Sequence, residues 1–80
     1  MQKTIHSRMS KLVSQKIVEM RKTAGYTQRD LAKKLGREHS FVARIEQGER
    51  RVDIVELFLI CKTCDVSAQV LFSKLIDQFD

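Results

Sequence analysis

The sequence predicts a small all-α domain, and three observations support that prediction. Proline is absent and glycine occurs three times in 80 residues, which suits helices joined by short turns. No run of alternating β-branched and aromatic residues appears, so the signals for strands are weak. Apolar residues instead recur at helical spacing in five successive segments. We therefore expect one domain over residues 1–80, with a core that is modest because the chain is short.

The first helix is expected over about residues 8–24, after a polar lead-in over residues 1–7. Its apolar residues recur every three or four positions, as they do on one face of a helix. This face consists of Met9, Leu12, Val13, Ile17, Met20 and Ala24. Gly25 comes next, and glycine commonly ends a helix because it adopts the left-handed conformation without strain.

Two shorter helices are expected next, over about 28–35 and about 39–46, with Gly36 in the turn between them. Gly36 can take a positive φ, so the chain can turn sharply at this point. Ala32 is small, which lets the third helix cross close over the second, and Gly48 ends the third helix. The residues expected to lock the two helices at one angle are Leu31, Leu35, Val42 and Ile45.

Two capping-box patterns mark the starts of helices. Thr27 is followed three residues later by Asp30, and Asp53 is followed three residues later by Glu56. In this pattern each side chain accepts a hydrogen bond from the backbone N–H of the other residue. The pairs therefore predict that the second helix begins at residue 28 and the fourth at residue 54.

The fourth and fifth helices are expected over about 54–64 and about 68–78, and Ser67 can cap the fifth. The residues expected to point inward from the fourth helix are Ile54, Leu57, Ile60, Cys61 and Cys64. The fifth helix carries a broad apolar stripe made of Leu71, Phe72, Leu75, Ile76 and Phe79. This stripe either packs wholly on the first and fourth helices or forms the interface of a symmetric homodimer, which is the interpretation we prefer.

Charge is distributed unevenly along the chain. Residues 1–52 carry 13 Lys and Arg against 5 Asp and Glu, a balance of +8, whereas residues 53–80 carry 2 against 5, a balance of −3. A basic face attracts phosphate backbones, although ordinary solvated helices could carry the same charges.

Neither a membrane span nor an N-terminal secretory signal is visible. We therefore expect a cytoplasmic protein with no membrane partner.

A set of residues within positions 12–72 forms a pattern known from one family. It comprises Arg21, Gly25-Tyr26-Thr27-Gln28, Leu31-Ala32, Leu35-Gly36, Ile45-Glu46, Gly48 and Glu49-Arg50-Arg51. On these residues the chain resembles the phage repressor and Cro-like helix-turn-helix family, also called the Xre family, whose fold is a five-helix lambda-repressor-like DNA-binding domain. Asp65 stands where that family has the glycine of a Gly-Val-Ser hinge, and Val52 where many members have proline. Both departures concern the stiffness of loops.

The resemblance implies that the third helix is a recognition helix, which lies in the major groove of double-stranded DNA. The residues implied to face the bases are Glu38, His39, Ser40, Ala43 and Arg44. Arg44 can donate two hydrogen bonds to guanine O6 and N7, and Ser40 can donate or accept at either purine. The role of Phe41 stays open between contact with a thymine methyl group and packing at the dimer or backbone side.

The resemblance also implies which residues hold the domain on DNA and which hold the fold together. The residues implied to contact phosphates are Gln28, Arg29, Gln47, Arg50 and Arg51. Such contacts fix the register of the protein on DNA and carry no sequence information. Arg21 and Glu46 are implied to form an internal ion pair between the first and third helices, so neither is counted as a DNA contact.

The pattern Cys61-x-x-Cys64 has three interpretations, namely buried core thiols, a redox sensor and a metal site. A zinc site needs about four ligands, and the chain offers no second cysteine pair. We favour core thiols, and expect no metal and no cofactor. No catalytic constellation is visible either, because the neighbouring His39 and Ser40 do not place a base on a nucleophile and no phosphate-binding glycine loop occurs.

The sequence therefore predicts a sequence-specific double-stranded DNA-binding transcriptional regulator that acts as a repressor and is not an enzyme. As a homodimer it would read a near-palindromic operator with two recognition helices about 34–36 Å apart. Two alternatives stay open. One is an antitoxin or restriction-controller type of autoregulator with a protein partner, and the other is a protein-interaction module.

Overall fold

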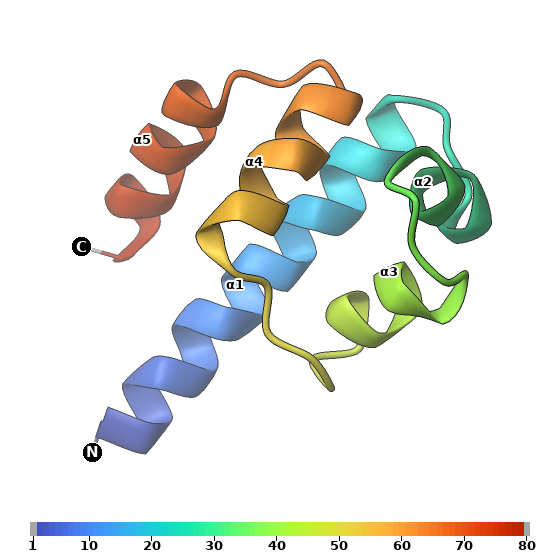
Figure 1. Ribbon diagram of the computed structural model, residues 1–80. Coiled ribbons are helices and arrows are strands. Elements are labelled where there is room, and N and C mark those ends of the chain that lie inside the picture. The colour runs from blue at the N-terminus through green and yellow to red at the C-terminus, as the bar shows by residue number, and fades with distance from the viewer. Residues whose placement is uncertain (1, 80) are drawn as a thin grey trace.

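The computed structural model describes residues 2–79, with side chains described for residues 7–78, and the predicted all-α fold is confirmed. Its regular structure in these residues consists of helices (Figure 1). They are α1 (Gln2–Thr23), α2 (Gln28–Lys34), α3 (Ser40–Glu46), α4 (Ile54–Thr63) and α5 (Ala68–Phe79). The helix α1 begins at Gln2, earlier than the expected start near residue 8, because residues 2–24 contain neither glycine nor proline to end a helix.

Both predicted capping boxes are present and fix where α2 and α4 begin. The hydroxyl of Thr27 accepts from the Asp30 N–H at 3.0 Å, and the Asp30 carboxylate accepts from the Thr27 N–H at 3.0 Å. The hydrogen bond from the backbone of Thr27 is also the main cause that lowers the pKa of Asp30. At α4, the Asp53 carboxylate accepts from the Glu56 N–H at 2.7 Å, and Glu56 accepts from the Asp53 N–H at 3.0 Å.

Four turns place a residue in the left-handed conformation, at Gly25, Gly36, Gly48 and Asp65. Gly36 has φ +69° between α2 and α3, and the next N–H, that of Arg37, donates to the Ala32 carbonyl at 2.9 Å. After α4, Asp65 has φ 60° at the position where the resembled family has glycine. A non-glycine residue in this conformation carries a steric cost that glycine avoids. The turn after α4 therefore uses the left-handed conformation although its residue is aspartate.

The core lies where the inner faces of the helices meet, and every helix contributes to it. The buried apolar residues are Ile17, Met20, Leu31, Ala32, Phe41, Val42, Ile45, Leu57, Ile60, Cys61, Cys64, Leu71 and Leu75. The helix α3 packs mainly on α1 and α2, whereas α4 packs mainly on α2 and α5. Figure 1 shows α2 and α3 at one side of the molecule and α5 at the other. The helix-turn-helix pair is thus held away from the C-terminal helix.

Three predictions about which side chains point inward or outward were wrong. Leu71 and Leu75, expected in a dimer interface, are 4% and 3% exposed because they form the inner face of α5 against the core of the same chain. Ile54, expected to point inward, is 68% exposed at the start of α4. The side chain of Phe79, also expected in the interface, lies outside the described residues.

None of the described helices is both long enough and apolar enough to span a membrane.

Candidate nucleic-acid interface

The helix α3 has one buried face and one face turned outward. Phe41, Val42 and Ile45 are at most 6% exposed and anchor the helix on the core. Positions three, four and seven residues apart lie on one side of a helix, so a second set shares the opposite side. This set consists of Ser40, Ala43, Arg44 and Gln47, of which Arg44 and Gln47 are exposed and the other two half-buried. A row of small and polar side chains is therefore available to a ligand.

The two residues before α3 are also accessible. Glu38 and His39 are both exposed. His39 occupies the N-cap position of α3, but its backbone is already helical and its side chain makes no capping hydrogen bond. Its imidazole is therefore not used by the helix. All five residues implied to read bases lie on or beside the outward face of α3, with none in the core.

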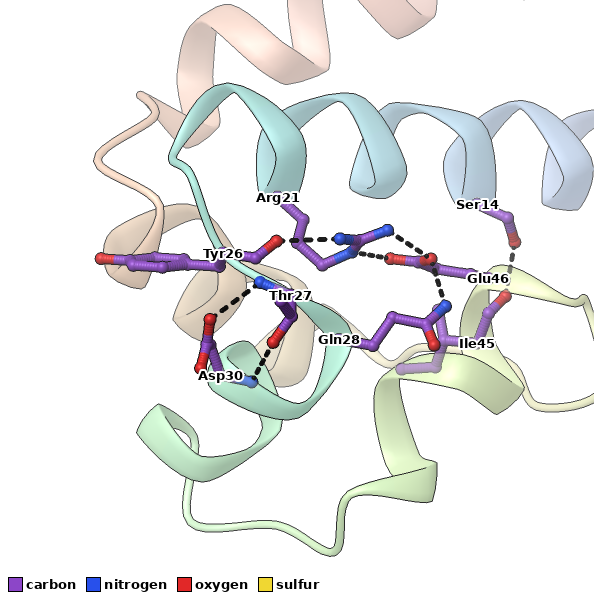
Figure 2. A network of polar contacts seen from close by, with 8 residues as sticks. All are labelled: Ser14, Arg21, Tyr26, Thr27, Gln28, Asp30, Ile45 and Glu46. Carbon is purple, nitrogen blue, oxygen red and sulfur yellow. Dashed lines mark hydrogen bonds and ion pairs between the residues drawn. The ribbon is translucent and has the colours of Figure 1, made fainter.

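Arg21 and Glu46 form the ion pair that was expected between the first and third helices (Figure 2). Arg21 Nε donates to Glu46 Oε2 at 2.6 Å, and Arg21 Nη2 donates to Glu46 Oε1 at 3.1 Å. The third guanidinium nitrogen, Nη1, donates to the carbonyl of Tyr26 at 2.8 Å. The two side chains are only 10% and 6% exposed. The pair therefore ties the end of α3 to α1 and to the turn before α2.

Gln28 joins the same network from the start of α2. Its amide nitrogen donates to Glu46 Oε1 at 2.8 Å, as Figure 2 shows. A glutamine amide carries two N–H groups, so one N–H remains for a phosphate oxygen. On α1, Ser14 donates to the carbonyl of Ile45 at 2.9 Å and so satisfies a backbone group near the end of α3. Both ends of the helix-turn-helix pair are thus oriented by named polar contacts.

Arg50, expected to contact phosphate, has internal partners. Its Nη1 and Nη2 donate to the two carboxylate oxygens of Glu56, each at 2.8 Å, and Nη1 also donates to the carbonyl of Arg51 at 2.8 Å. The hydrogen bond from Arg50 is the main cause that lowers the pKa of Glu56 to about 2. The carboxylate of Glu56 therefore balances the positive charge that Arg50 would offer to a phosphate. The other basic candidates, Arg29 and Arg51, are exposed.

The role of Phe41 is decided by its position. It is 6% exposed and belongs to the core, so it does not reach a thymine methyl group. The guanidinium groups of Arg37 and Arg50 lie over its ring at 4.1 and 4.8 Å from the centroid. Both arginines also donate to the carboxylate of Glu56. The sequence analysis did not predict that Arg37, Phe41, Arg50 and Glu56 would lie together, because no local spacing rule relates these four positions.

The two cysteines lie in the core as free thiols, 1% and 6% exposed. Burial raises the pKa of both Cys61 and Cys64. They are therefore protonated and weakly nucleophilic at neutral pH. Within the part of the chain that the structure describes, no three potential metal ligands gather at one point.

A short helix braced by another, with a polar outward face, defines a helix-turn-helix domain of the kind that enters the major groove of DNA. The chain belongs to the Xre-type helix-turn-helix family, because a family model described as helix-turn-helix matches residues 17–71. This is a family of DNA-binding regulators and not of enzymes. No curated protein matches the chain significantly.

Solved structures with related sequences have the same fold. The chain is 38% identical to an XRE-family like protein from Pseudomonas syringae pv. tomato str. DC3000, with a TM-score of 0.89 over 96% of this chain and 94% of that one. It is 36% identical to the restriction-modification controller protein C.Esp1396I, with a TM-score of 0.77 over 86% and 91%. A tetramer of that controller in complex with its natural 35 base-pair operator gives 35% identity and a TM-score of 0.76 over 89% and 93%.

Proposed function

We propose that this chain is a sequence-specific regulator of transcription that binds double-stranded DNA as a homodimer and represses by occluding a promoter. The observation that supports this most directly is the outward face of α3, which exposes Arg44 and Gln47 while Glu46 beside them is held inward by Arg21. An exposed polar face on a firmly braced helix is what major-groove reading requires. We propose that the protein acts in the cytoplasm, where such an operator would be accessible.

The proposed base-reading residues are Glu38, His39, Ser40, Ala43 and Arg44. Arg44 is the strongest of them, because an exposed guanidinium can donate two parallel hydrogen bonds to guanine. The proposed phosphate-binding residues are Gln28, Arg29, Gln47 and Arg51. Arg50 is left out of this set because it is engaged with Glu56. Binding through the cations Arg29 and Arg51 should weaken as the salt concentration rises.

The proposed dimer forms through the apolar face that α4 and α5 leave exposed. Ile54, Phe58, Phe72 and Ile76 are each more than half exposed and line one groove of about 440 Å³ between the two helices. Val55 and Leu59 extend this apolar surface along α4. A second copy is the proposed occupant, because a two-fold dimer buries the same patch on both protomers and presents two recognition helices to a near-palindromic site.

A second candidate is a restriction-controller type of autoregulator, which would bind the operator of its own gene. The similarity to the controller protein C.Esp1396I favours this over an antitoxin role, since that neighbour is solved on its natural operator. The two functions differ in where the operator lies. An operator upstream of the gene for this chain, adjoining a restriction gene, would support the second candidate, whereas an adjoining toxin gene would support the antitoxin role.

Selection of bound sequences from a random pool of duplex DNA tests the proposal. We expect an enriched near-palindrome, and mobility shifts on it that persist at moderate salt while shifts on random DNA disappear. If no sequence is enriched and no fragment of its own locus is shifted even at low salt, the DNA-binding proposal fails. A protein-interaction module would then be the better explanation.

A further inference from the structure

A single carboxylate on α4 connects the segments on both sides of α3. Glu56 lies in the first turn of α4, while Arg37 precedes α3 and Arg50 follows it. Glu56 Oε2 accepts from Arg37 Nη1 at 3.2 Å and from Arg50 Nη2 at 2.8 Å, and Oε1 accepts from Arg50 Nη1 at 2.8 Å. Both flanks of the helix therefore converge on one side chain.

The helix α3 itself takes part through Phe41 in its first turn. The guanidinium of Arg37 lies 4.1 Å from the centre of the Phe41 ring, and that of Arg50 lies 4.8 Å from it. An arginine over an aromatic ring is attracted to it electrostatically. We call Arg37, Phe41, Arg50 and Glu56 the Glu56 cluster. The cluster joins α4 to a residue of α3 as well as to the loops beside it.

The helix packing gives this connection its importance. The helix α3 packs mainly on α1 and α2, and α4 packs mainly on α2 and α5. The Glu56 cluster therefore adds a connection between α4 and α3, made through Arg37 and Arg50, to the packing of both helices on α2. At the same time, α4 carries Ile54 and Phe58, which belong to the proposed dimer interface.

We propose that Glu56 is a positioning residue for DNA recognition, which sets the orientation of α3 relative to α4 and thereby the separation of the two recognition helices in the dimer. The inference rests on the proposed function, since it concerns how the dimer meets two half-sites. Each added base pair moves a half-site by about 3.4 Å along the DNA axis. A dimer whose recognition helices are held rigidly binds one half-site spacing more tightly than the others. A dimer whose recognition helices can move binds operators of different spacing with similar affinity.

The first test compares operators that differ only in the spacing of their half-sites. The selected operator and versions longer or shorter by one central base pair are titrated with wild type and with Glu56→Gln. Glutamine keeps the size of the side chain and an oxygen that can accept at the cap of α4. We expect the preference of the wild type for the selected spacing to fall about tenfold in the variant. Arg37→Gln should also lower the preference for the selected spacing, by a smaller factor.

The control for a general loss of stability is Ser67→Ala, which removes the hydroxyl that accepts from the Val70 N–H at the start of α5 at 3.2 Å. It should lower the melting temperature but keep the spacing preference of the wild type. If Glu56→Gln is folded, dimeric and as selective for spacing as the wild type, the positioning role is refuted. If the wild type itself prefers no operator, the proposed function is what fails.

A second measurement needs no DNA and decides the positioning role by itself. Nitroxide labels on Gln47→Cys, after α3, and Lys62→Cys, on α4, report the distance between the two helices by pulsed dipolar spectroscopy, with the labelled chain diluted in an excess of unlabelled chain so that only distances within one protomer are measured. Both positions are exposed, and the native cysteines are buried, so the chain without introduced cysteines serves as the labelling control. We expect a narrow distribution in the wild-type background and a broader one with Glu56→Gln. Equal widths would overturn the inference.

Discussion

Arg21 of α1 and Glu46 of α3 meet in a bidentate ion pair that the fold encloses almost completely. The two hydrogen bonds measure 2.6 and 3.1 Å, and the side chains are 10% and 6% exposed. The same carboxylate accepts from Gln28 on α2, and the same guanidinium donates to the carbonyl of Tyr26. Four segments of the chain therefore meet at one salt bridge, directly behind the proposed DNA-binding face.

Removing one partner of this pair should destabilise the domain strongly. For Arg21→Met we expect the free energy of unfolding to fall by about 3–5 kcal/mol, because Glu46 would remain buried without its compensating charge. The double variant Arg21→Met/Glu46→Leu should regain part of that loss. Urea unfolding followed by circular dichroism measures both. A loss below about 1 kcal/mol, typical of an exposed pair, would show that solvent screens the pair effectively.

Arg44 and Arg51 should affect DNA binding in different ways. We expect Arg44→Ala to weaken binding to the selected operator by about 1–3 kcal/mol and to relax the preference at one base position. Arg51→Ala should weaken all sequences alike and reduce the dependence on salt. Titrations of operator and random DNA at several salt concentrations separate the two effects. Equal losses on both kinds of DNA for Arg44→Ala would remove it from the base-reading set.

The proposed dimer interface can be broken without damage to the core. Phe58 and Ile76 are each 52% exposed, so Phe58→Arg should leave the monomer folded while it places a charge in the apolar contact between protomers. We expect sedimentation to show that Phe58→Arg is a monomer. We also expect its affinity for the operator to be lower than that of the wild type. The contrasting variant is Leu71→Ala, which removes a buried side chain and should cost about 2–5 kcal/mol of stability. A dimer that survives Phe58→Arg would place the interface elsewhere.

The fold could be predicted because local signals agreed with one another. The pairs Thr27–Asp30 and Asp53–Glu56 are read directly from spacing, and both form the capping boxes that spacing implies. Helical spacing similarly indicated the buried face of α3, with Val42 and Ile45 inward. These features depend on residues within one helical turn of each other, and such spacing can be read directly from the sequence.

Features that depend on packing between helices were predicted less well. The helix α4 is apolar nearly all round, so its sequence placed both Ile54 and Leu57 inward, although only Leu57 faces the core. On α5 the stripe was recognised, but the structure divides it between buried Leu71 and exposed Phe72. Likewise, the role of Arg50 depends on Glu56, whose approach is decided by the path of the loop between α3 and α4.

Asp65 should be replaceable by glycine with a gain in stability. Its φ of 60° costs a residue with a Cβ more than it costs glycine. For Asp65→Gly we expect the free energy of unfolding to rise by about 0.5–1 kcal/mol, because the relief of strain exceeds the extra flexibility of glycine in the unfolded chain. Thermal unfolding at neutral pH measures the change. Asp65→Ala, which keeps the Cβ, is the control and should bring no gain.

Stability should fall in acid partly through Glu56. Its pKa is lowered from 4.5 to about 2 in the folded chain, chiefly by the hydrogen bond from Arg50. Because this pKa is lower in the folded chain than in the unfolded one, the ionised Glu56 carboxylate adds its full contribution to the free energy of unfolding above about pH 4.5. That contribution is lost as the pH falls toward 2. We expect this contribution to be about 1–2 kcal/mol, because Arg37 and Arg50 remain partly exposed to water.

The matching measurement is urea unfolding of the wild type and of Glu56→Gln between pH 7 and pH 2.5. Glu56→Gln should be less stable at pH 7, and its deficit should shrink as the pH falls, since protonation removes the same charge from the wild type. Asp30, whose pKa is also lowered, titrates in both proteins and cancels in the comparison. A deficit that stays constant over this range would mean that the charge of Glu56 does not stabilise the fold.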